Sequence, residues 1–582
     1  MNLEIRIFET AEAQLLLLQH KISMINMKKS IAIISLLIVS LVAFAQNDSL
    51  RILKAQKGTY FSLKSYKAKP LSEWKTTKEL LPKPIYEDNK IFVELYYKAW
   101  ELAFKNIYEP SDKNGFVSQY LDAAFNKNMF LWDGCFITMF SNYGIPYVPG
   151  IESLDNFYAK QFPDGEISRE INRATGLDFS EWVNWENKPL FTRWGSTVKN
   201  GNVVTNVSEP VVYINREVPL EKPYLTLDAL NHPILAWAEL ESYNITGNRE
   251  RLKLIYLPLK KYYGALQRFL MQGNGLYVTD WASMDNSPRN SYILKDGTGI
   301  DISCEMVLFA NNLKEIAKLS GNYKDTAAFI SDVNHLSGII NEKMWNPKEN
   351  FYYDLTKDEK FVPVKTIAGF WTLISGVATP ERAALLEKEL NNRKTFNRLH
   401  RVPSLAADQK YYSPLGDYWR GSIWPPTNTM IIRGLEKYNL NKTAYDIAMN
   451  HLNNVADVYR KTGTVWENYA ADSILQGNNS RKDFVGWSGL APILYFLEYG
   501  IGLKPNAAIN TLTWNIRGSK KVGCENYSFN NHRTSLVAEN DGLNGKSFKI
   551  NIISDGNYTL IVNHNDVQKI VEIKKGEQIL SF

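Results

Sequence analysis

Apolar residues recur at intervals of three and four positions along most of the middle of the chain, a spacing typical of amphipathic helices. In 228–245, for example, one apolar stripe is formed by Leu230, Ile234, Leu235, Trp237, Ala238 and Leu240. The same spacing predicts helices over 91–107, 228–245, 249–272, 302–320, 324–343, 381–391, 426–437, 441–460 and 486–499. Each needs partners to bury its stripe, so we expect one large helical domain over 88–503.

Long segments rich in Gly, Pro and Trp separate some of these helices. They span 161–225, 276–300 and 400–425. Simple connections between helices are much shorter, so these segments are candidates for functional loops.

The pattern changes after Pro505 to short runs in which apolar and polar residues alternate. These runs cover 511–516, 534–539, 547–553, 558–562 and 567–573, with turn residues such as Asn540-Asp541-Gly542 between them. Alternation with a period of two predicts strands. We therefore expect a small antiparallel, β-sandwich-like domain over 505–582, with a boundary near 503.

The N-terminal region carries a targeting pattern. Met27-Lys28-Lys29 precedes an apolar run over 31–44 that ends in Ala43-Phe44-Ala45. This is typical of a secretory signal peptide over 27–45. The alternative is a membrane anchor, which the short apolar run does not favour. We interpret 1–26 as an upstream extension from a start assigned too early, and 46–87 as a lead segment. The prediction is an exported protein, periplasmic or extracellular, with no stable membrane insertion after cleavage.

The amino-acid composition excludes several classes of partner and site. The 582 residues include 67 Lys and Arg against 61 Asp and Glu, a net charge of +6 without a dense basic run, which argues against a nucleic-acid partner. Three cysteines, Cys135, Cys304 and Cys524, and seven scattered histidines show no metal-binding spacing. No cofactor is predicted, and no EF-hand loop supports a structural calcium ion. No feature predicts an oligomeric state. Chemistry based on carboxylates is expected.

Four stretches carry a resemblance when taken together. They are Phe130-Leu-Trp-Asp-Gly-Cys-Phe136, Trp281-Ala-Ser-Met-Asp-Asn-Ser-Pro-Arg289, Asp417-Tyr-Trp-Arg-Gly-Ser-Ile-Trp-Pro-Pro426, and Thr464-Val-Trp-Glu-Asn-Tyr469 followed by Gly486-Trp-Ser-Gly489. In this order, over 88–503, the chain resembles glycoside hydrolase family 63 and its trehalase relatives. The resemblance implies an all-α catalytic domain, an (α/α)₆ barrel of six helical hairpins, with the site in its loops.

The same resemblance assigns the catalytic pair. Cleaving a glycosidic bond requires an acid that protonates the leaving oxygen and a carboxylate that activates water or attacks. By resemblance to this inverting family, Asp285 is the acid and Glu467 the base. The two carboxyl groups are then expected roughly 6.5–9.5 Å apart, and the pKa of Asp285 must be raised for it to stay protonated.

The neighbouring motif residues suggest a sugar subsite, because pyranose faces pack on aromatic rings and carboxylates accept hydroxyl hydrogen bonds. The predicted substrate-binding residues are Trp132, Asp133, Arg289, Tyr418, Trp419, Arg420, Trp424 and Trp487, and resemblance to a trehalase-clan segment implies that Asn156 and Arg169 also bind the glycone. Most of these residues have a structural alternative, and Glu467 can be a solvated loop residue. The tryptophans can be core residues, the arginines can form ion pairs that support loops, and Asp133 and Asp285 can cap a helix and a turn.

Some positions depart from the family pattern. Ser283 replaces a usual Gly, the position ahead of Asp285 that matches the family's Glu holds no acid, and Asn231-His232-Pro233-Ile234 keeps one of two usual prolines. Without the large β domain that commonly precedes the barrel, contacts to the leaving group are expected from loops such as 176–225.

We predict an exported, inverting, exo-acting α-glycosidase, an α-glucosidase acting on oligosaccharides. Trehalase, or another hydrolase of glucosyl or mannosyl conjugates, is the alternative within enzymes. A catalytically inactive glycan-binding protein is the alternative outside them. A lyase on a related barrel would need a Tyr/His or Arg abstraction site, and histidine is scarce near the motifs.

Overall fold

The helices occupy the part of the chain where the periodicity predicts them. The computed structural model describes residues 59–123, 126–161, 165–176, 232–278, 284–293, 297–518, 520–540, 548–565 and 567–581, and three two-residue strands at 198–199, 202–203 and 216–217. The predicted extension and the signal peptide lie outside the described residues. Of the 176–225 loop, only residue 176 and the three two-residue strands are described. The described residues from 59 onward belong to one compact unit.

The observed helices follow the predicted ones closely. They are α3 (Lys90–Phe104), α6 (Leu235–Thr246), α7 (Arg249–Leu270), α9 (Ile300–Ser320), α10 (Thr326–Lys343), α12 (Pro380–Leu390), α13 (Pro425–Lys437), α14 (Asn441–Thr462) and η10 (Leu490–Ile501), which is of the π type. α6 begins at Leu235 rather than 228, after His232 and Pro233. The structure adds α4 (Leu131–Ser141), α5 (Asp155–Ala159) and α11 (Trp371–Ser375).

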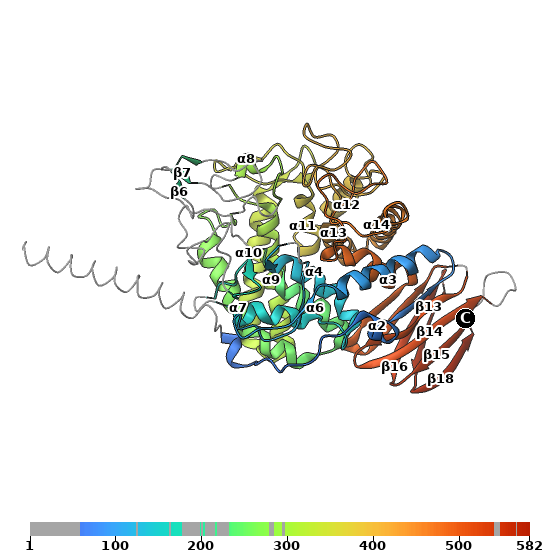
Figure 1. Ribbon diagram of the computed structural model, residues 1–582. Helices are drawn as coiled ribbons and strands as arrows, with labels where there is room; N and C mark the ends of the chain where they lie inside the picture. The colour runs from blue at the N-terminus through green and yellow to red at the C-terminus, as the bar shows by residue number, and fades with distance from the viewer. Residues whose placement is uncertain are drawn as a thin grey trace, which may run out of the picture. The chain divides into compact units, whose positions relative to one another are not determined.

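Six of these helices contact one another in a closed order. α4 contacts α6, α6 contacts α9, α9 contacts α11, and α11 contacts α13. Both α13 and α4 contact η10, which completes the cycle. Further helices lie against this group, since α3 and α14 pack on η10 and α7 and α10 pack on α9 (Figure 1). The ends of the six helices therefore border a common space.

Two sheets follow the helices in the chain. One has the order β1-β13-β14-β15-β18, formed by Lys83–Tyr86, Val522–Phe529, His532–Asn540, Phe548–Ser554 and Gly576–Ser581. The other has the order β11-β12-β16-β17, formed by Leu503–Asn506, Thr511–Ile516, Tyr558–His564 and Val567–Ile573. The predicted strands over 511–516 and 567–573 are found at those residues.

The expected antiparallel domain needs two corrections. β12 and β16 pair in parallel, from Thr511 with Thr559 to Ile516 with His564, while the other pairs in the two sheets are antiparallel. Moreover, β1 comes from the predicted lead segment and pairs with β13. The sheets therefore draw a strand from outside 505–582, because a strand before α3 can reach the edge left open by β13.

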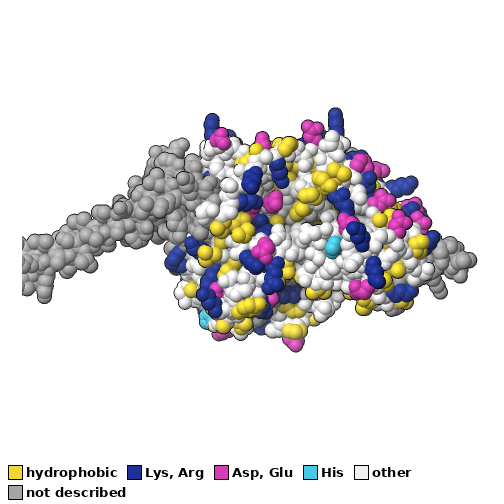
Figure 2. Space-filling view, turned by 90° about the horizontal axis from the view of Figure 1, so that it is seen from below, with side chains coloured by type: hydrophobic (Ala, Val, Ile, Leu, Met, Phe, Trp, Pro, Cys, Tyr) yellow, Lys and Arg dark blue, Asp and Glu magenta, His cyan; other side chains and the backbone are white. Residues whose placement is uncertain are grey.

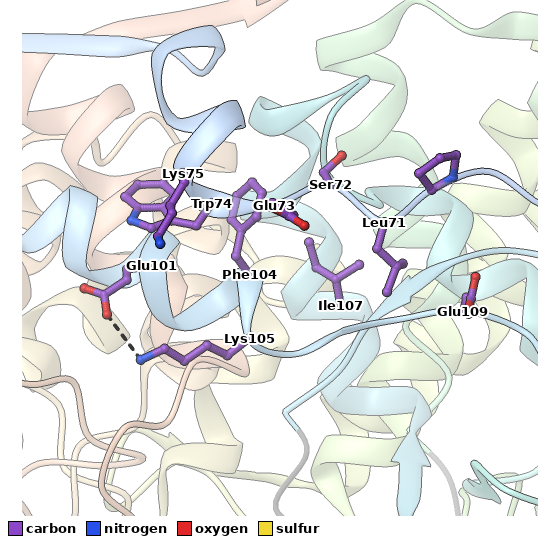
Figure 3. Close-up of a pocket in the computed structure, with 11 residues that line it drawn as sticks. Leu71, Ser72, Glu73, Trp74, Lys75, Glu101, Phe104, Lys105, Ile107 and Glu109 are labelled. Carbon is purple, nitrogen blue, oxygen red and sulfur yellow. Dashed lines mark hydrogen bonds and ion pairs between the residues drawn. The ribbon is translucent and has the colours of Figure 1, made fainter.

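The lead segment also packs on α3. Trp74 of α2 (Trp74–Thr77) lies 5.5 Å from Phe104, measured between ring centres. Leu71, Trp74, Phe104 and Ile107 line a groove of about 860 Å³, and an ion pair between Glu101 and Lys105 lies along it (Figure 3).

Charges of both signs are interspersed on the face shown in Figure 2. Among the described residues, no helix has the length and apolar character needed to cross a membrane.

Candidate active site

Four of the predicted site residues lie at the N-terminal ends of helices in the closed group. Trp132 and Asp133 open α4, Trp424 immediately precedes α13, and Trp487 lies just before η10. α4 follows the strand β4 (Asn128–Phe130), which pairs with β5 (Glu170–Asn172). The backbone N–H of Leu131 donates to the carbonyl of Arg169 at 2.9 Å, so this pairing fixes where the helix starts.

The aromatic residues form one continuous wall. The ring centres of Trp132 and Trp487 are 5.8 Å apart, and those of Trp424 and Trp487 are 5.7 Å apart. Trp419 stacks on Trp424 at 4.5 Å, and Tyr418 meets Trp424 edge-on at 4.8 Å. Five residues predicted from three separate motifs therefore form one aromatic cluster. Trp419, Trp424 and Trp487 are buried in it, and Trp132 and Tyr418 are its partly exposed members.

Glu467 lies against this wall. It is buried, with 2% of its surface exposed. Its backbone carbonyl accepts from Nε1 of Trp487 at 2.8 Å, and its backbone N–H donates to the carbonyl of Arg481 at 3.0 Å. The hydroxyl of Tyr418 donates to Oε1 at 3.3 Å, and the backbone N–H of Arg481 donates to Oε2 at 3.2 Å. The carboxylate is held from both sides.

Asn286 attaches the Asp285 loop to the 417–420 turn. Its Nδ2 donates to the carbonyl of Asp417 at 3.0 Å, and its Oδ1 accepts from the backbone N–H of Trp419 at 2.8 Å. The guanidinium of Arg420 donates to the Asn286 carbonyl at 3.1 Å. Asp285 is half-buried, and its backbone carbonyl accepts from Asn290 at 3.0 Å. Trp281 and Ser283 of the same motif lie outside the described residues.

Tyr418 links the two predicted catalytic carboxylates. Burial raises the pKa of its hydroxyl well above the usual value, and the negative charges of Glu467, Asp285 and Asp133 raise this pKa further. All three carboxylates therefore act on one phenol. The backbone of Tyr418 has a φ of 56°, in the left-handed region that a bulky residue rarely adopts. Such strain commonly accompanies functional positions.

Asp133 is a buried carboxyl group that follows Trp132 in α4. Burial raises its pKa well above the usual value, the charges of Asp122 and Glu170 raise this pKa further, and Arg169 opposes the shift. Its Oδ1 is among the buried polar atoms of the described residues that have no hydrogen-bond partner, as are Nε1 of Trp132 and Nε1 of Trp424. Buried polar atoms are normally paired, so these atoms suit a ligand.

Three other predicted residues, Arg289, Asn156 and Arg169, form ion pairs or hydrogen bonds with other parts of the protein. Arg289 is fully buried and forms ion pairs with Asp301 and with Asp354, the latter at 3.1 Å. Oδ1 of Asn156 accepts from the backbone of Val117 at 2.9 Å, and its Nδ2 donates to the Ser118 carbonyl at 3.1 Å.

Arg169 lies 3.4 Å from Glu170 and acts on Asp133 through its charge. The contacts of Arg289 match the ion-pair alternative, and the sugar contacts of Arg289 and Asn156 remain predictions.

The structure adds a polar pair that the motifs did not indicate. The ring of His232 lies 6.0 Å from that of Trp132, and its Nδ1 lies 2.5 Å from Oε2 of Glu305. Nε1 of Trp371 donates to the other oxygen of Glu305 at 2.9 Å. A single histidine gives no sequence signal, and Glu305 lies inside a helix pattern.

Comparisons with known proteins find similarity to glycoside hydrolases. Residues 221–475 match the model of the mannosylglycerate hydrolase MGH1-like glycoside hydrolase domain. An uncharacterized protein of Borreliella burgdorferi is 27% identical over 362 residues, which are 60% of this chain and 75% of that protein. A mannosyl-oligosaccharide glucosidase of Arabidopsis thaliana is 24% identical over 276 residues, 38% of this chain. The alignment spans 32%, about a third, of that plant protein.

The fold also has a solved counterpart. A family 63 mannosylglycerate hydrolase from Thermus thermophilus, crystallised with glucose, aligns with a TM-score of 0.50 and 18% identity. The alignment covers 69% of this chain and 99% of that one.

Proposed function

We propose that this chain, which carries a glycoside hydrolase domain of the family 63 group, is an inverting, exo-acting α-glycosidase. The catalytic domain is an (α/α)₆ barrel in this proposal, supported by the closed order of contacts among α4, α6, α9, α11, α13 and η10. Asp285 is the general acid and Glu467 the general base.

The observation that carries the proposal is the position of Tyr418. Its hydroxyl is hydrogen-bonded to Glu467 and lies within the electrostatic influence of Asp285. The carboxyl groups of Asp285 and Glu467, from loops far apart in the chain, thus both interact with the phenol of Tyr418. An acid that protonates the leaving oxygen and a base that activates water must flank the same bond.

The glycone lies, in this account, against the wall that Trp132, Trp424 and Trp487 form. The partnerless Oδ1 of Asp133 and the two indole N–H groups would hydrogen-bond its hydroxyls. We infer an α-glucosidase acting on oligosaccharides, because the plant relative is named a glucosidase. The matched domain model favours a second candidate, a hydrolase of mannosyl or glucosyl conjugates.

A substrate panel tests this function. Wild-type protein, Asp285→Asn and Glu467→Gln are incubated with α-linked glucose disaccharides, trehalose, glucosylglycerate and mannosylglycerate, and released sugar is measured. We expect the wild type to cleave one class and each variant to lose about 10²- to 10⁴-fold in rate. Asp457→Asn and Glu250→Gln, on exposed helix faces, serve as controls. Binding without cleavage by the wild type would support the glycan-binding alternative instead.

We also propose that the protein is exported after cleavage of the signal peptide at 27–45. The mass of the mature protein isolated from its host tests this, because cleavage after Ala45 leaves Gln46 as the first residue. A mature chain that retains the apolar run 31–44 would contradict export by this route.

A further inference from the structure

A large cavity lies between the helices and the hairpin formed by β13 and β14. It has a volume of about 920 Å³. Its lining comes mainly from the turn after α4, the connection between α6 and α7, and the tip of the hairpin between Phe529 and His532. Ligand sites often lie where two structural parts of a protein meet.

This cavity lies at the opposite end of α4 from the proposed glycone site. Trp132 and Asp133 are in the first turn of α4, whereas Asn142, which lines the cavity, directly follows its last residue. α4 has 11 residues, so at 1.5 Å per residue its ends are about 15 Å apart. None of the predicted site residues is among the described residues that line the cavity. A ligand here therefore lies apart from the aromatic wall.

Asn142 brings a hydrogen-bond donor without a partner to this cavity. Its side chain is buried, with 2% of the residue exposed, and its Oδ1 accepts from the backbone N–H of Ile151 at 2.9 Å. Its Nδ2 is among the buried polar atoms of the described residues that have no hydrogen-bond partner. An unpaired buried donor lowers stability. An oxygen atom of a ligand in the cavity would satisfy it.

The hairpin tip adds two further side-chain amides. Asn530 and Asn531 form the two-residue turn between the strands, with φ values of 45° and 61° that Asn tolerates better than most residues. The backbone N–H of Asn530 donates to the carbonyl of Ile245, near the end of α6, at 2.8 Å. Its Nδ2 donates to Oδ1 of Asn510 at 2.7 Å. The helices therefore hold the tip in a fixed position beside the cavity.

The charged groups around the cavity are largely compensated. Arg251 forms ion pairs with Glu239 at 2.7 Å and with Asp155 at 2.8 Å, and Lys64 pairs with the same Asp155. The charged side chains of the lining carry both signs, and they are Lys64, Arg249, Arg251 and Arg533 with Glu152, Glu250 and Asp555. Because neither sign dominates, the lining favours a neutral ligand over an anion or a cation.

The remaining groups suit a ligand with many hydroxyls. Amide side chains donate and accept hydrogen bonds, as sugar hydroxyls do, and Ile145, Pro146 and Leu254 add an apolar part for the C–H face of a ring. We propose that this cavity is a second, non-catalytic binding site for a neutral saccharide. Through it the protein would stay attached to a glycan while the proposed active site remains free. The inference does not depend on the roles assigned to Asp285 and Glu467.

Hydrogen exchange followed by mass spectrometry tests the proposal on the wild-type protein. Glucose, mannose and galactose are the neutral probes, because a monosaccharide is not cleaved, and sulfate is the anionic probe. We expect at least one of the sugars to slow exchange in the segments 245–251 and 528–533, which border the cavity. Sulfate should leave exchange in both segments unchanged.

Two variants with matched controls locate the binding. Leu254→Trp places a large ring in the cavity and should abolish the slowed exchange. Leu257→Trp, on the same helix α7 but outside the lining, is its control, since Leu254 and Leu257 are 44% and 50% exposed.

Asn142→Asp keeps the oxygen that Ile151 uses and removes the free donor. It should weaken sugar binding about 3- to 10-fold. Asn312→Asp is the control, because Nδ2 of Asn312 also has no partner among the described residues and Asn312 does not line the cavity. Circular dichroism of each variant checks that it is folded.

The outcomes separate this site from the proposed function. Slowed exchange with none of the sugars, or slowed exchange that persists in Leu254→Trp, would overturn the proposal. An effect of sulfate without an effect of any sugar would overturn it in favour of an anion site. Leu254→Trp should still cleave small substrates at the wild-type rate. If no substrate is cleaved at all, the proposed function fails, whereas a sugar effect that Leu254→Trp abolishes would still support the second site.

Discussion

Tyr418 has an unusual combination of backbone, hydrogen bond and charge environment. Its φ of 56° places a bulky side chain in a strained region, and its hydroxyl donates to Glu467 at 3.3 Å. A hydrogen bond to the ionised form of a carboxyl group lowers that group's pKa. We therefore assign Tyr418 the role of holding Glu467 ionised and oriented as a base.

Replacing Tyr418 by Phe should expose this role. Loss of the hydrogen bond makes the ionised form of Glu467 less favourable, so its pKa rises. The acidic limb of the kcat/KM profile should then move upward by about one pH unit, and kcat should fall about tenfold. Tyr412→Phe is the matched control, because its hydroxyl donates to Asp472 at 2.8 Å away from the site. An unmoved acidic limb would show that Tyr418 acts only through packing.

The buried carboxyl group of Asp133 should lower the stability of the folded protein at neutral pH. Burial raises the pKa of Asp133 in the folded state. Above the unfolded pKa of about 3.9, the unfolded chain ionises this group more readily than the folded protein does, so the free energy of unfolding falls. This penalty is absent below that pH and grows as the pH rises toward the folded pKa. Asn carries no charge and avoids the penalty.

Asp133→Asn should therefore raise the Tm at pH 7 and leave it nearly unchanged near pH 3.5. The same variant should weaken glycone binding, since it loses a hydroxyl acceptor. Thermal scans at the two pH values and a glucose titration measure both effects. If the variant is less stable at pH 7 and binds glucose normally, Asp133 has a structural role and does not bind the sugar.

Some of these residues could be predicted from the sequence, and others could not. Tyr418, Trp419, Trp424 and Glu467 belong to compact local motifs, and the structure brings them together. The partners of Arg289 lie 12 and 65 positions away, at Asp301 and Asp354. Its buried ion pairs could not be recognised without the fold, so a sugar contact and a structural role had equal support.

At the scale of elements, the acid loop depends on one side chain. Asn286 hydrogen-bonds both Asp417 and Trp419 across 131 and 133 positions of chain. Removing it frees the loop that carries Asp285 from the turn that carries Tyr418. Misplacement of a catalytic group by a small distance can cost about 10²-fold in rate.

Asn286→Ala should therefore lower kcat about 10- to 100-fold while the protein stays folded. Asn450→Ala is the control, because Asn450 accepts from the backbone of Arg401 at 2.8 Å and donates to Leu399 at 3.0 Å in another loop. It should lower stability by a similar amount and spare kcat. Equal kcat for both variants would contradict a positioning role for Asn286.

The spacing of apolar residues predicts the helices that have one apolar face. It does not predict α4, because all residues of α4 but Trp132 are buried and its apolar and polar positions therefore show no period. β1 was missed for a different reason. It is four residues long, and its pairing with β13 joins segments more than 430 positions apart, which no local pattern indicates.

At the scale of the whole molecule, the sheets and the helices share contacts. Trp514 of β12 is fully buried, and its indole N–H donates to the carbonyl of Ile501 at the end of η10 at 3.0 Å. η10 also closes the ring of helices around the site. The sheets should therefore unfold together with the helices rather than as an independent domain.

Trp514→Ala should lower the free energy of unfolding by about 3–5 kcal/mol and shift one common transition, followed by calorimetry. Ile579→Ala, at a residue 62% exposed in β18, should leave the Tm unchanged. Two separate transitions, with the site-bearing helices unaffected, would show that the two parts are energetically independent.

The most direct test of the central claim is the stereochemistry of the first product. Proton NMR follows the wild type with the α-linked glucoside that it cleaves and records which anomer appears before mutarotation. Inversion by Asp285 and Glu467 predicts β-glucose first, and release about 10²- to 10⁴-fold slower from Asp285→Asn and Glu467→Gln. α-Glucose as the first product would contradict the assignment of Glu467 as a base acting through water.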